Sequence, residues 1–187
     1  MAGPRVHITG AACTGATTLG HAVARALGVV HLDTDDFYWQ TSDPPYTRKY
    51  SAAERYARLA EAAGAGAWVI SGALDGWGDP LAAKADLIVF LTAPTPLRLA
   101  RLKARERRRF GRRIEPGGDM EDIHAGFLIW AAQYDDAGFT GRSRPRHEAW
   151  LADQTAPLLR LDAQAPVETL STHVLARLAQ IGYRKPD

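Results

Sequence analysis

A glycine-rich loop between a predicted strand and a predicted helix is the first feature of this sequence suited to chemistry. Four residues separate Gly10 from Gly15, and Thr17 follows two positions later. This spacing is typical of a phosphate-binding P-loop, in which the glycines let backbone amides curl around a phosphate and the hydroxyl binds Mg²⁺. The residues expected to bind the phosphates of a nucleotide are Gly10, Ala12, Cys13, Thr14, Gly15, Ala16, Thr17 and Thr18.

One position departs from the P-loop pattern, because Ala16 stands where the pattern has lysine. That lysine normally neutralises charge on the β and γ phosphates, so its loss removes a preorganised cation from the transition state. Either another cation takes its place, or the protein binds nucleotide with little turnover. A plain strand-to-helix turn is the structural alternative, but the position of the loop after the first strand favours a phosphate site.

Two carboxylates follow the second predicted strand, at Asp33 and Asp35. The carboxyl ends of parallel strands line the ligand crevice, and strand alternation would place both side chains on one side. Two carboxylates beside a triphosphate need a cation or a hydroxyl between them. We therefore expect Asp33 to hold Mg²⁺ together with Thr17, and Asp35 to position or deprotonate an acceptor hydroxyl. A solvated acidic turn is the alternative.

These residues must be positioned by a sheet whose strands alternate with helices, an order that predicts βαβ units and an α/β fold. Strands are expected at residues 5–9, 29–33, 68–71, 86–92 and 157–161. Helices are expected at residues 17–27, 51–64, 94–109, 119–137 and 166–181. Ser51 and Glu54 form a capping box at the start of the second helix. Residues 34–50 are too long for a simple connection, which favours a functional loop.

Composition restricts the class of protein. The 187 residues carry a net charge of +2, which does not favour a nucleic-acid partner, and fit one domain. Cys13 is the only cysteine, which suits a reducing compartment. We expect no signal peptide and no membrane span, hence a cytoplasmic protein. The sequence leaves monomer and homodimer equally open.

Several segments together carry a family resemblance over nearly the whole chain. They are Thr17-Thr18-Leu19-Gly20, His31 to Trp39, Ser71-Gly72, Gly76 to Pro80, and Pro116 to Met120. The chain resembles P-loop kinases of the adenylate kinase and shikimate kinase type, and more narrowly a bacterial group of adenylate-kinase-like ATPases whose P-loop typically lacks the lysine. The resemblance implies a three-layer P-loop NTPase fold, with a five-stranded parallel sheet, helices on both faces and an arginine-rich lid.

The resemblance also implies how a single domain at residues 1–187 is organised, with an acceptor-side segment at about 34–66 and a lid at about 106–146. Asp33 and Asp35 match the Asp-x-Asp of shikimate kinases, whose first acid lies near Mg²⁺ and whose second meets the acceptor hydroxyl. The acceptor is expected to contact Phe37, Tyr38, Trp39, Asp75 and Trp77.

An arginine-rich segment at residues 98–113 matches the region from which such enzymes bring lid arginines over the phosphates. Arginine suits this role because its planar fork grips phosphate oxygens. The arginines expected at the nucleotide are Arg101 and Arg144 for binding, and Arg105, Arg109 and Arg142 for catalysis. A solvated basic face is one alternative. A nucleic-acid patch is disfavoured, because Phe110 is the only interleaved aromatic residue.

The favoured function is phosphoryl transfer from ATP, with Mg²⁺, to a hydroxyl of a small molecule. A nucleoside monophosphate kinase is an alternative, although Asp75-Gly76-Trp77-Gly78 lacks the arginine that adenylate kinases carry there. A nucleotide-binding regulator with little turnover is a second alternative, and Ala16 is its main support.

Overall fold

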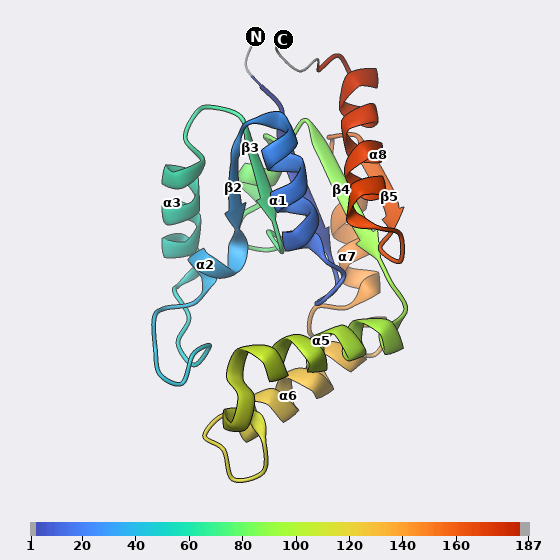
Figure 1. The fold of residues 1–187 in the computed structure, drawn as a ribbon. Helices are drawn as coiled ribbons and strands as arrows, with labels where there is room; N and C mark the ends of the chain where they lie inside the picture. The colour runs from blue at the N-terminus through green and yellow to red at the C-terminus, as the bar shows by residue number, and fades with distance from the viewer. Residues whose placement is uncertain (1–2, 184–187) are drawn as a thin grey trace.

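Five parallel strands form one sheet at the centre of the protein, in a computed structural model that describes residues 3–183 (Figure 1). The strands are β1 (Arg5–Gly10), β2 (Val30–Asp33), β3 (Trp68–Ser71), β4 (Leu87–Thr92) and β5 (Leu158–Asp162). Their spatial order is β2-β3-β1-β4-β5, with every neighbouring pair parallel. The predicted five-stranded parallel sheet is confirmed.

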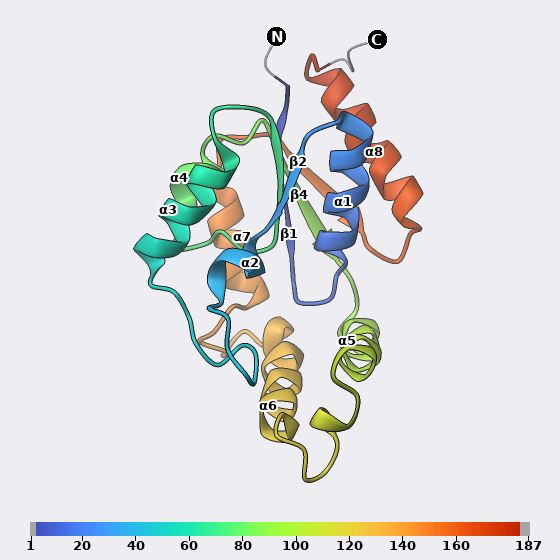
Figure 2. The ribbon, with the colours of Figure 1, turned by 60° about the vertical axis from the view of Figure 1, so that its left-hand side comes forward.

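Helices cover both faces of this sheet, which gives the predicted three layers (Figure 2). Helices α1 (Ala16–Leu27) and α8 (Val167–Gln180) lie on one face. Helices α3 (Ala52–Ala63), α4 (Asp79–Ala82) and α7 (Arg144–Ala152) lie on the other. The short helix α2 (Thr34–Tyr38) follows β2 at the carboxyl edge of the sheet.

Strand alternation explains how the sheet packs against a layer of helices on each of its faces. On β1, Val6 and Ile8 pack with the α1 and α8 side, while the buried polar residues His7 and Thr9 point to the opposite face. Strand β4 is buried on both faces, as a continuous apolar run in a parallel sheet should be. The core therefore anchors the carboxyl ends of the strands, where the predicted site residues lie.

Helices α5 (Thr95–Phe110) and α6 (Glu121–Ala132) pack against each other beyond the carboxyl ends of the strands (Figures 1 and 2). Two short 3₁₀ turns, Gly111–Ile114 and Gln133–Asp135, follow them. We call residues 95–135 the α5–α6 hairpin. Within residues 3–183, no helix has both the length and the apolar character needed to cross a bilayer.

Three elements differ from the sequence predictions. Residues 34–38 form helix α2 rather than loop, because the Asp33 side chain accepts a hydrogen bond from the Asp35 amide and caps the helix. The helix expected over 119–137 is shorter, since the 3₁₀ turn at Gln133–Asp135 ends it. Helix α7 is not among the predicted helices, and Pro145 lies in its first turn, where proline is favoured. The capping box at Ser51 and Glu54 is confirmed.

Candidate active site at the P-loop

The P-loop connects β1 to α1 through backbone conformations that a phosphate-binding turn requires. Gly15 has φ of 98° and Cys13 has φ of 62°, and both angles lie in the left-handed region. The Thr14 hydroxyl donates to the Ala11 carbonyl over 2.9 Å, which closes the turn from within. Unpaired amides at the start of the twelve-residue helix α1 then face the loop, as an anion site needs.

Thr17 and Asp33 meet beside this loop, as the sequence predicted. The Thr17 hydroxyl donates to Asp33 Oδ2 over 2.6 Å, from the first turn of α1 to the end of β2. Both side chains offer hard oxygen ligands, and Mg²⁺ is usually bound through one or two such groups together with phosphate oxygens. The donor set therefore fits a magnesium ion beside a nucleotide.

Asp35 lies next to this pair, but not for the reason given by strand alternation. It belongs to helix α2 rather than to β2, and its amide donates to Asp33 Oδ1 over 3.0 Å. Asp35 is exposed, yet enough protein surrounds it that desolvation raises the pKa of its carboxyl. The Asp33 carboxylate raises this pKa further, while Arg142 and Arg105 oppose the shift.

Helix α5 brings the first group of arginines to the P-loop. The Arg101 guanidinium donates to the Thr14 carbonyl over 3.5 Å and to the Ala163 carbonyl over 2.9 Å. Arg105 lies one turn further along and donates from two nitrogens to Glu106. Arg109 stacks on the ring of Tyr46, with 5.3 Å to the centroid. These three side chains follow one stripe of the helix.

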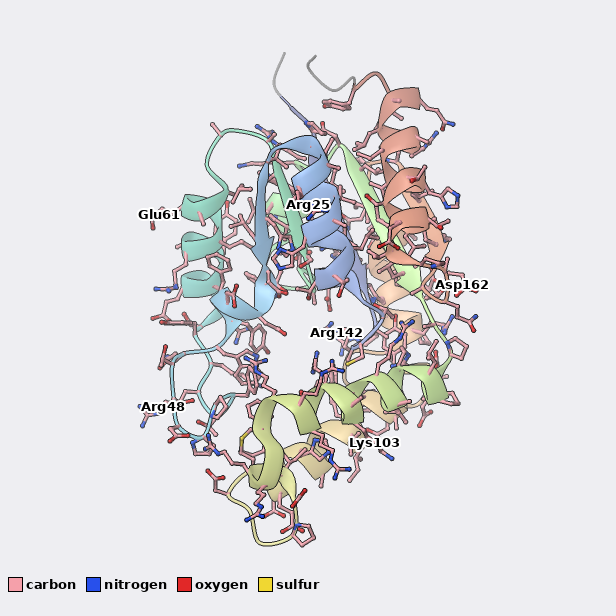
Figure 3. The ribbon with its side chains drawn as sticks, in the orientation of Figure 1. Arg25, Arg48, Glu61, Lys103, Arg142 and Asp162 are labelled. Atoms are coloured by element: carbon pink, nitrogen blue, oxygen red, sulfur yellow. The ribbon has the colours of Figure 1, made fainter. Side chains whose placement is uncertain are left out.

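The arginines that follow the hairpin have different roles. Arg142 lies between the P-loop end of the sheet and α5 (Figure 3), stacks on Trp130 at 5.6 Å, and opposes the rise in the pKa of Asp35. Arg144 instead donates to Asp135 Oδ1 over 2.7 Å. Of the two predicted residues, Arg142 therefore faces the candidate site, whereas Arg144 is held in an ion pair.

The predicted acceptor residues divide into two groups. Phe37 and Trp77 pack against the core on the α3 side of the sheet, and the Trp77 indole nitrogen donates to the Ala73 carbonyl. Tyr38 and Trp39 are half-buried and stack with cations, since Arg55 lies 3.6 Å from the Tyr38 ring centroid and Lys49 lies 5.4 Å from that of Trp39. Contact of any of these residues with an acceptor stays a prediction.

Sequence reasoning missed two contacts that join the acceptor-side segment to the hairpin. The Arg113 guanidinium forms ion pairs with Asp43 and Asp119, each at 2.5 Å. The rings of Tyr46 and Phe110 meet edge to face at 6.3 Å. No local pattern signals the Arg113–Asp43 and Tyr46–Phe110 contacts, because the two residues of each pair lie far apart in sequence.

Sequence analysis also missed a buried polar cluster between β1 and α7. Asp75, which was expected at the acceptor, lies near this cluster. His147 of α7 lies within hydrogen-bonding distance of the Thr9 hydroxyl (3.1 Å) and of the Tyr134 hydroxyl (3.0 Å). His7 is fully buried, with Nε2 3.0 Å from the Gly72 carbonyl. Burial lowers the pKa of His7 and of His147 to about 4, although the nearby Asp75 carboxylate opposes both shifts.

Acidification from pH 7 to pH 5 should therefore destabilise the protein. The unfolded histidines take up protons near pH 6.5, while folded His7 and His147 stay neutral until about pH 4, so stability falls as pH falls through this window. Each histidine should contribute about 2 kcal/mol to the loss. Urea unfolding at both pH values measures it.

Replacing one buried histidine should reduce this pH dependence. The His147→Gln variant removes one of the buried titrating groups, so its loss of unfolding free energy between pH 7 and pH 5 should be smaller than that of the wild type by about 2 kcal/mol. His173→Gln is the control, because His173 is exposed on α8. A pH dependence that is unchanged in His147→Gln would contradict the assignment.

Sequence comparison finds one informative relative. No model of a known protein family matches the chain. Over 175 residues the chain is 39% identical to "Uncharacterized protein YqaC" of Bacillus subtilis (strain 168). The match covers 93% of this chain and 97% of that protein, so the two correspond along nearly their whole lengths.

Solved structures of kinases share the fold. A shikimate kinase from Bacteroides thetaiotaomicron is 17% identical with a TM-score of 0.56, over 94% of this chain and 98% of its own. A sugar kinase from Janibacter sp. HTCC2649 is 17% identical with a TM-score of 0.54, over 97% of this chain and 99% of its own. At this identity the likeness establishes the fold, which is the P-loop kinase fold of the shikimate kinase type that the sequence resemblance implied.

Proposed function

This chain belongs to the family of the Bacillus subtilis protein YqaC, and we propose its function from the chemistry of the site. The protein is a kinase that transfers the γ-phosphoryl group of ATP, in the presence of Mg²⁺, to a hydroxyl of a small-molecule acceptor. The sugar kinase and the shikimate kinase that share the fold support the reaction class. The site residues support the division of roles.

The observation that carries the proposal is the hydrogen-bonded series Thr17–Asp33–Asp35 beside the P-loop. Thr17 donates to one oxygen of Asp33 over 2.6 Å, and the Asp35 amide donates to the other over 3.0 Å. The hydroxyl and the carboxylate that we propose to bind the metal are therefore adjacent to the residue that we propose as the base. Phosphoryl transfer to a hydroxyl needs these three groups side by side.

Each group has a definite task in the proposed reaction. The P-loop amides and the start of α1 bind the phosphates, and Thr17 with Asp33 would hold Mg²⁺, which neutralises charge on the phosphate oxygens. Asp35 accepts the proton of the acceptor hydroxyl while the oxygen of that hydroxyl forms a bond to the γ-phosphorus. The bond between that phosphorus and the leaving oxygen breaks, which releases ADP. Arg105, Arg109 and Arg142 stabilise the transferring group.

Calorimetric titration with ATP, with and without Mg²⁺, tests the nucleotide site directly. The wild type should bind ATP with a Kd on the order of micromolar when Mg²⁺ is present, and at least about tenfold more weakly without it. The Thr17→Val variant keeps the shape of the side chain but loses the hydroxyl, so most of the Mg²⁺ dependence should disappear. Thr172→Val on the exposed side of α8 is the matched control.

An alternative function is favoured by Ala16. Without the P-loop lysine, the protein would bind nucleotide as a regulator and turn it over slowly. Acceptor-dependent formation of ADP separates the two functions, and including nucleoside monophosphates among the acceptors tests the adenylate-kinase-like activity. If the wild type bound no ATP at millimolar concentration, the kinase proposal and the regulator alternative would both fail.

A further inference from the structure

The replacement of the P-loop lysine leaves a place for another cation near the phosphates. Ala16 is the first residue of α1, and its short side chain cannot reach a phosphate. The candidates on the other side of the site are the arginines of α5 and Arg142. Geometry distinguishes among them, because the cation must lie between the P-loop and Asp35, where phosphoryl transfer takes place.

Arg101 fixes which part of helix α5 lies beside the P-loop. Arg101 reaches the Thr14 carbonyl of the loop at 3.5 Å, and its other hydrogen bond, to Ala163 at 2.9 Å, holds it there. Residue 105 comes four positions later, so it lies on the same side of the helix, about 6 Å further along the axis. The Arg105 side chain is 45% exposed, which leaves its guanidinium accessible to a ligand.

A buried carboxylate fixes this guanidinium. Glu106 is only 4% exposed, an unusual position for a charged residue. The Arg105 Nε and Nη2 both donate to Glu106 Oε1, over 3.1 and 3.0 Å. Two hydrogen bonds to one oxygen restrict the rotation of a long side chain, so the orientation of Arg105 is set before a nucleotide binds.

The electrostatics agree with this placement of Arg105. Burial raises the pKa of the Cys13 thiol in the P-loop, and Arg105 opposes this shift more strongly than Arg98 or Arg101 does. Arg105 also opposes the raised pKa of Asp35, on the acceptor side. Arg142 opposes the shift of Asp35 more strongly than Arg105 does, but it is not among the charges that shift the pKa of Cys13, so Arg105 is the arginine that acts on both sides of the site. Arg109 stacks on Tyr46, and Arg101 is bound to backbone carbonyls.

We infer that Glu106 is a positioning residue that holds Arg105 over the P-loop, where the Arg105 guanidinium takes the place of the missing lysine and contacts the γ-phosphate of ATP. This inference rests on the proposed function, because it presumes that ATP binds at the P-loop. It goes beyond that function in assigning the compensating charge to one arginine, and in assigning the buried Glu106 a role in nucleotide recognition rather than in packing alone.

Calorimetric titrations with ATP and with ADP, both with Mg²⁺, test the pair. ADP lacks the γ-phosphate, so it separates the proposed contact from general nucleotide binding. The Arg105→Ala variant should bind ATP about tenfold to a hundredfold more weakly than the wild type, with ADP affinity changed by less than about threefold. Arg107→Ala is the control, since Arg107 is exposed on the same helix.

The Glu106→Asp variant tests the positioning role, because it keeps the charge and shortens the side chain by one methylene group. Its ATP affinity should fall by about fivefold to tenfold, again with ADP little changed. The same substitution should have no further effect in an Arg105→Ala background, because the residue acts only through Arg105. A purely structural role would weaken both nucleotides equally and would persist in the double variant.

Arg105→Lys provides a second test if Glu106→Asp does not fold. Lysine keeps the charge but cannot donate from two fixed nitrogens to Glu106, so the ATP-specific loss should appear again. Unchanged ATP affinity in Arg105→Lys and Arg105→Ala, or additive losses in the double variant, would overturn the inference while leaving the proposed function standing. Failure of the wild type to bind ATP would overturn the proposed function itself.

Discussion

The Asp35→Asn variant should lose acceptor-dependent ADP formation by about 10²- to 10⁴-fold, the range that a general base contributes. Its affinity for ATP with Mg²⁺ should stay within about threefold of the wild-type value. Asparagine has nearly the same shape as aspartate, but its amide cannot take the proton of the acceptor hydroxyl. The backbone amide of residue 35 still donates to Asp33, so the capped start of α2 is preserved.

The pH dependence of the same reaction gives an independent check on Asp35. Desolvation and the Asp33 carboxylate raise the pKa of Asp35, so its ionised, proton-accepting form is lost at a higher pH than for an ordinary aspartate. The rate of the wild-type enzyme should therefore fall as pH decreases through this raised pKa. Both measurements use steady-state ADP formation with any acceptor that the wild type phosphorylates.

Asp36→Asn is the matched control for Asp35→Asn. Asp36 is the next residue of α2 and is also exposed, but it makes no hydrogen bond to Asp33 in the described structure. Its substitution should change the rate by less than about threefold. Full activity in Asp35→Asn would remove the general base from the proposed mechanism, and loss of ATP binding in that variant would assign Asp35 to the nucleotide site instead.

The sequence was sufficient for the parts of the site that local patterns define. The glycine spacing from Gly10 to Gly15 predicts the turn between β1 and α1, since a backbone with positive φ and a helix start need few residues. The pairing of Thr17 with Asp33 also followed, because the P-loop and the end of β2 meet at one edge of a parallel sheet. The sheet itself followed from alternating strands and helices.

The sequence was not sufficient for the arginines, because their roles depend on which face of α5 meets another element. Residues 98–113 present cations on almost every side, so helical spacing selects a stripe without showing what it faces. The structure separates Arg98, which is 1% exposed, from the half-exposed Arg105. Arg144 was expected at the nucleotide, but it pairs with Asp135, which lies in a 3₁₀ turn where the sequence predicted α-helix up to residue 137.

Helix α2 shows the same limit at the acceptor side. Its five residues are too few for an apolar periodicity to be detected, and it forms because Asp33 caps it directly after β2. The Asp35 backbone amide donates to Asp33, so the two residues are neighbours, but strand alternation was the wrong reason to expect this because Asp35 belongs to α2. A side-chain cap, rather than the pleat of a strand, brings Asp35 toward the transfer site.

The Arg98→Met variant should lose about 2–4 kcal/mol of unfolding free energy, a larger loss than any other arginine substitution in α5. Arg98 donates to the Ala93 and Ala131 carbonyls, each over 3.2 Å, and to Asp135 over 3.1 Å. Methionine fills much of the volume but leaves these acceptors without their buried donor. Asp135 keeps Arg144 and is one-third exposed, so the loss is smaller than for a fully buried ion pair.

Urea unfolding of Arg98→Met and Arg108→Met compares a buried position with an exposed position of the same helix. Arg108 is exposed, so its substitution should change stability by less than about 0.5 kcal/mol. Arg98 connects the start of α5 to the end of α6, and the base of the hairpin therefore depends on it. If Arg98→Met kept its stability but lost ATP binding, Arg98 would belong with the nucleotide-binding arginines, and the division between structural and functional residues along α5 would have to be redrawn.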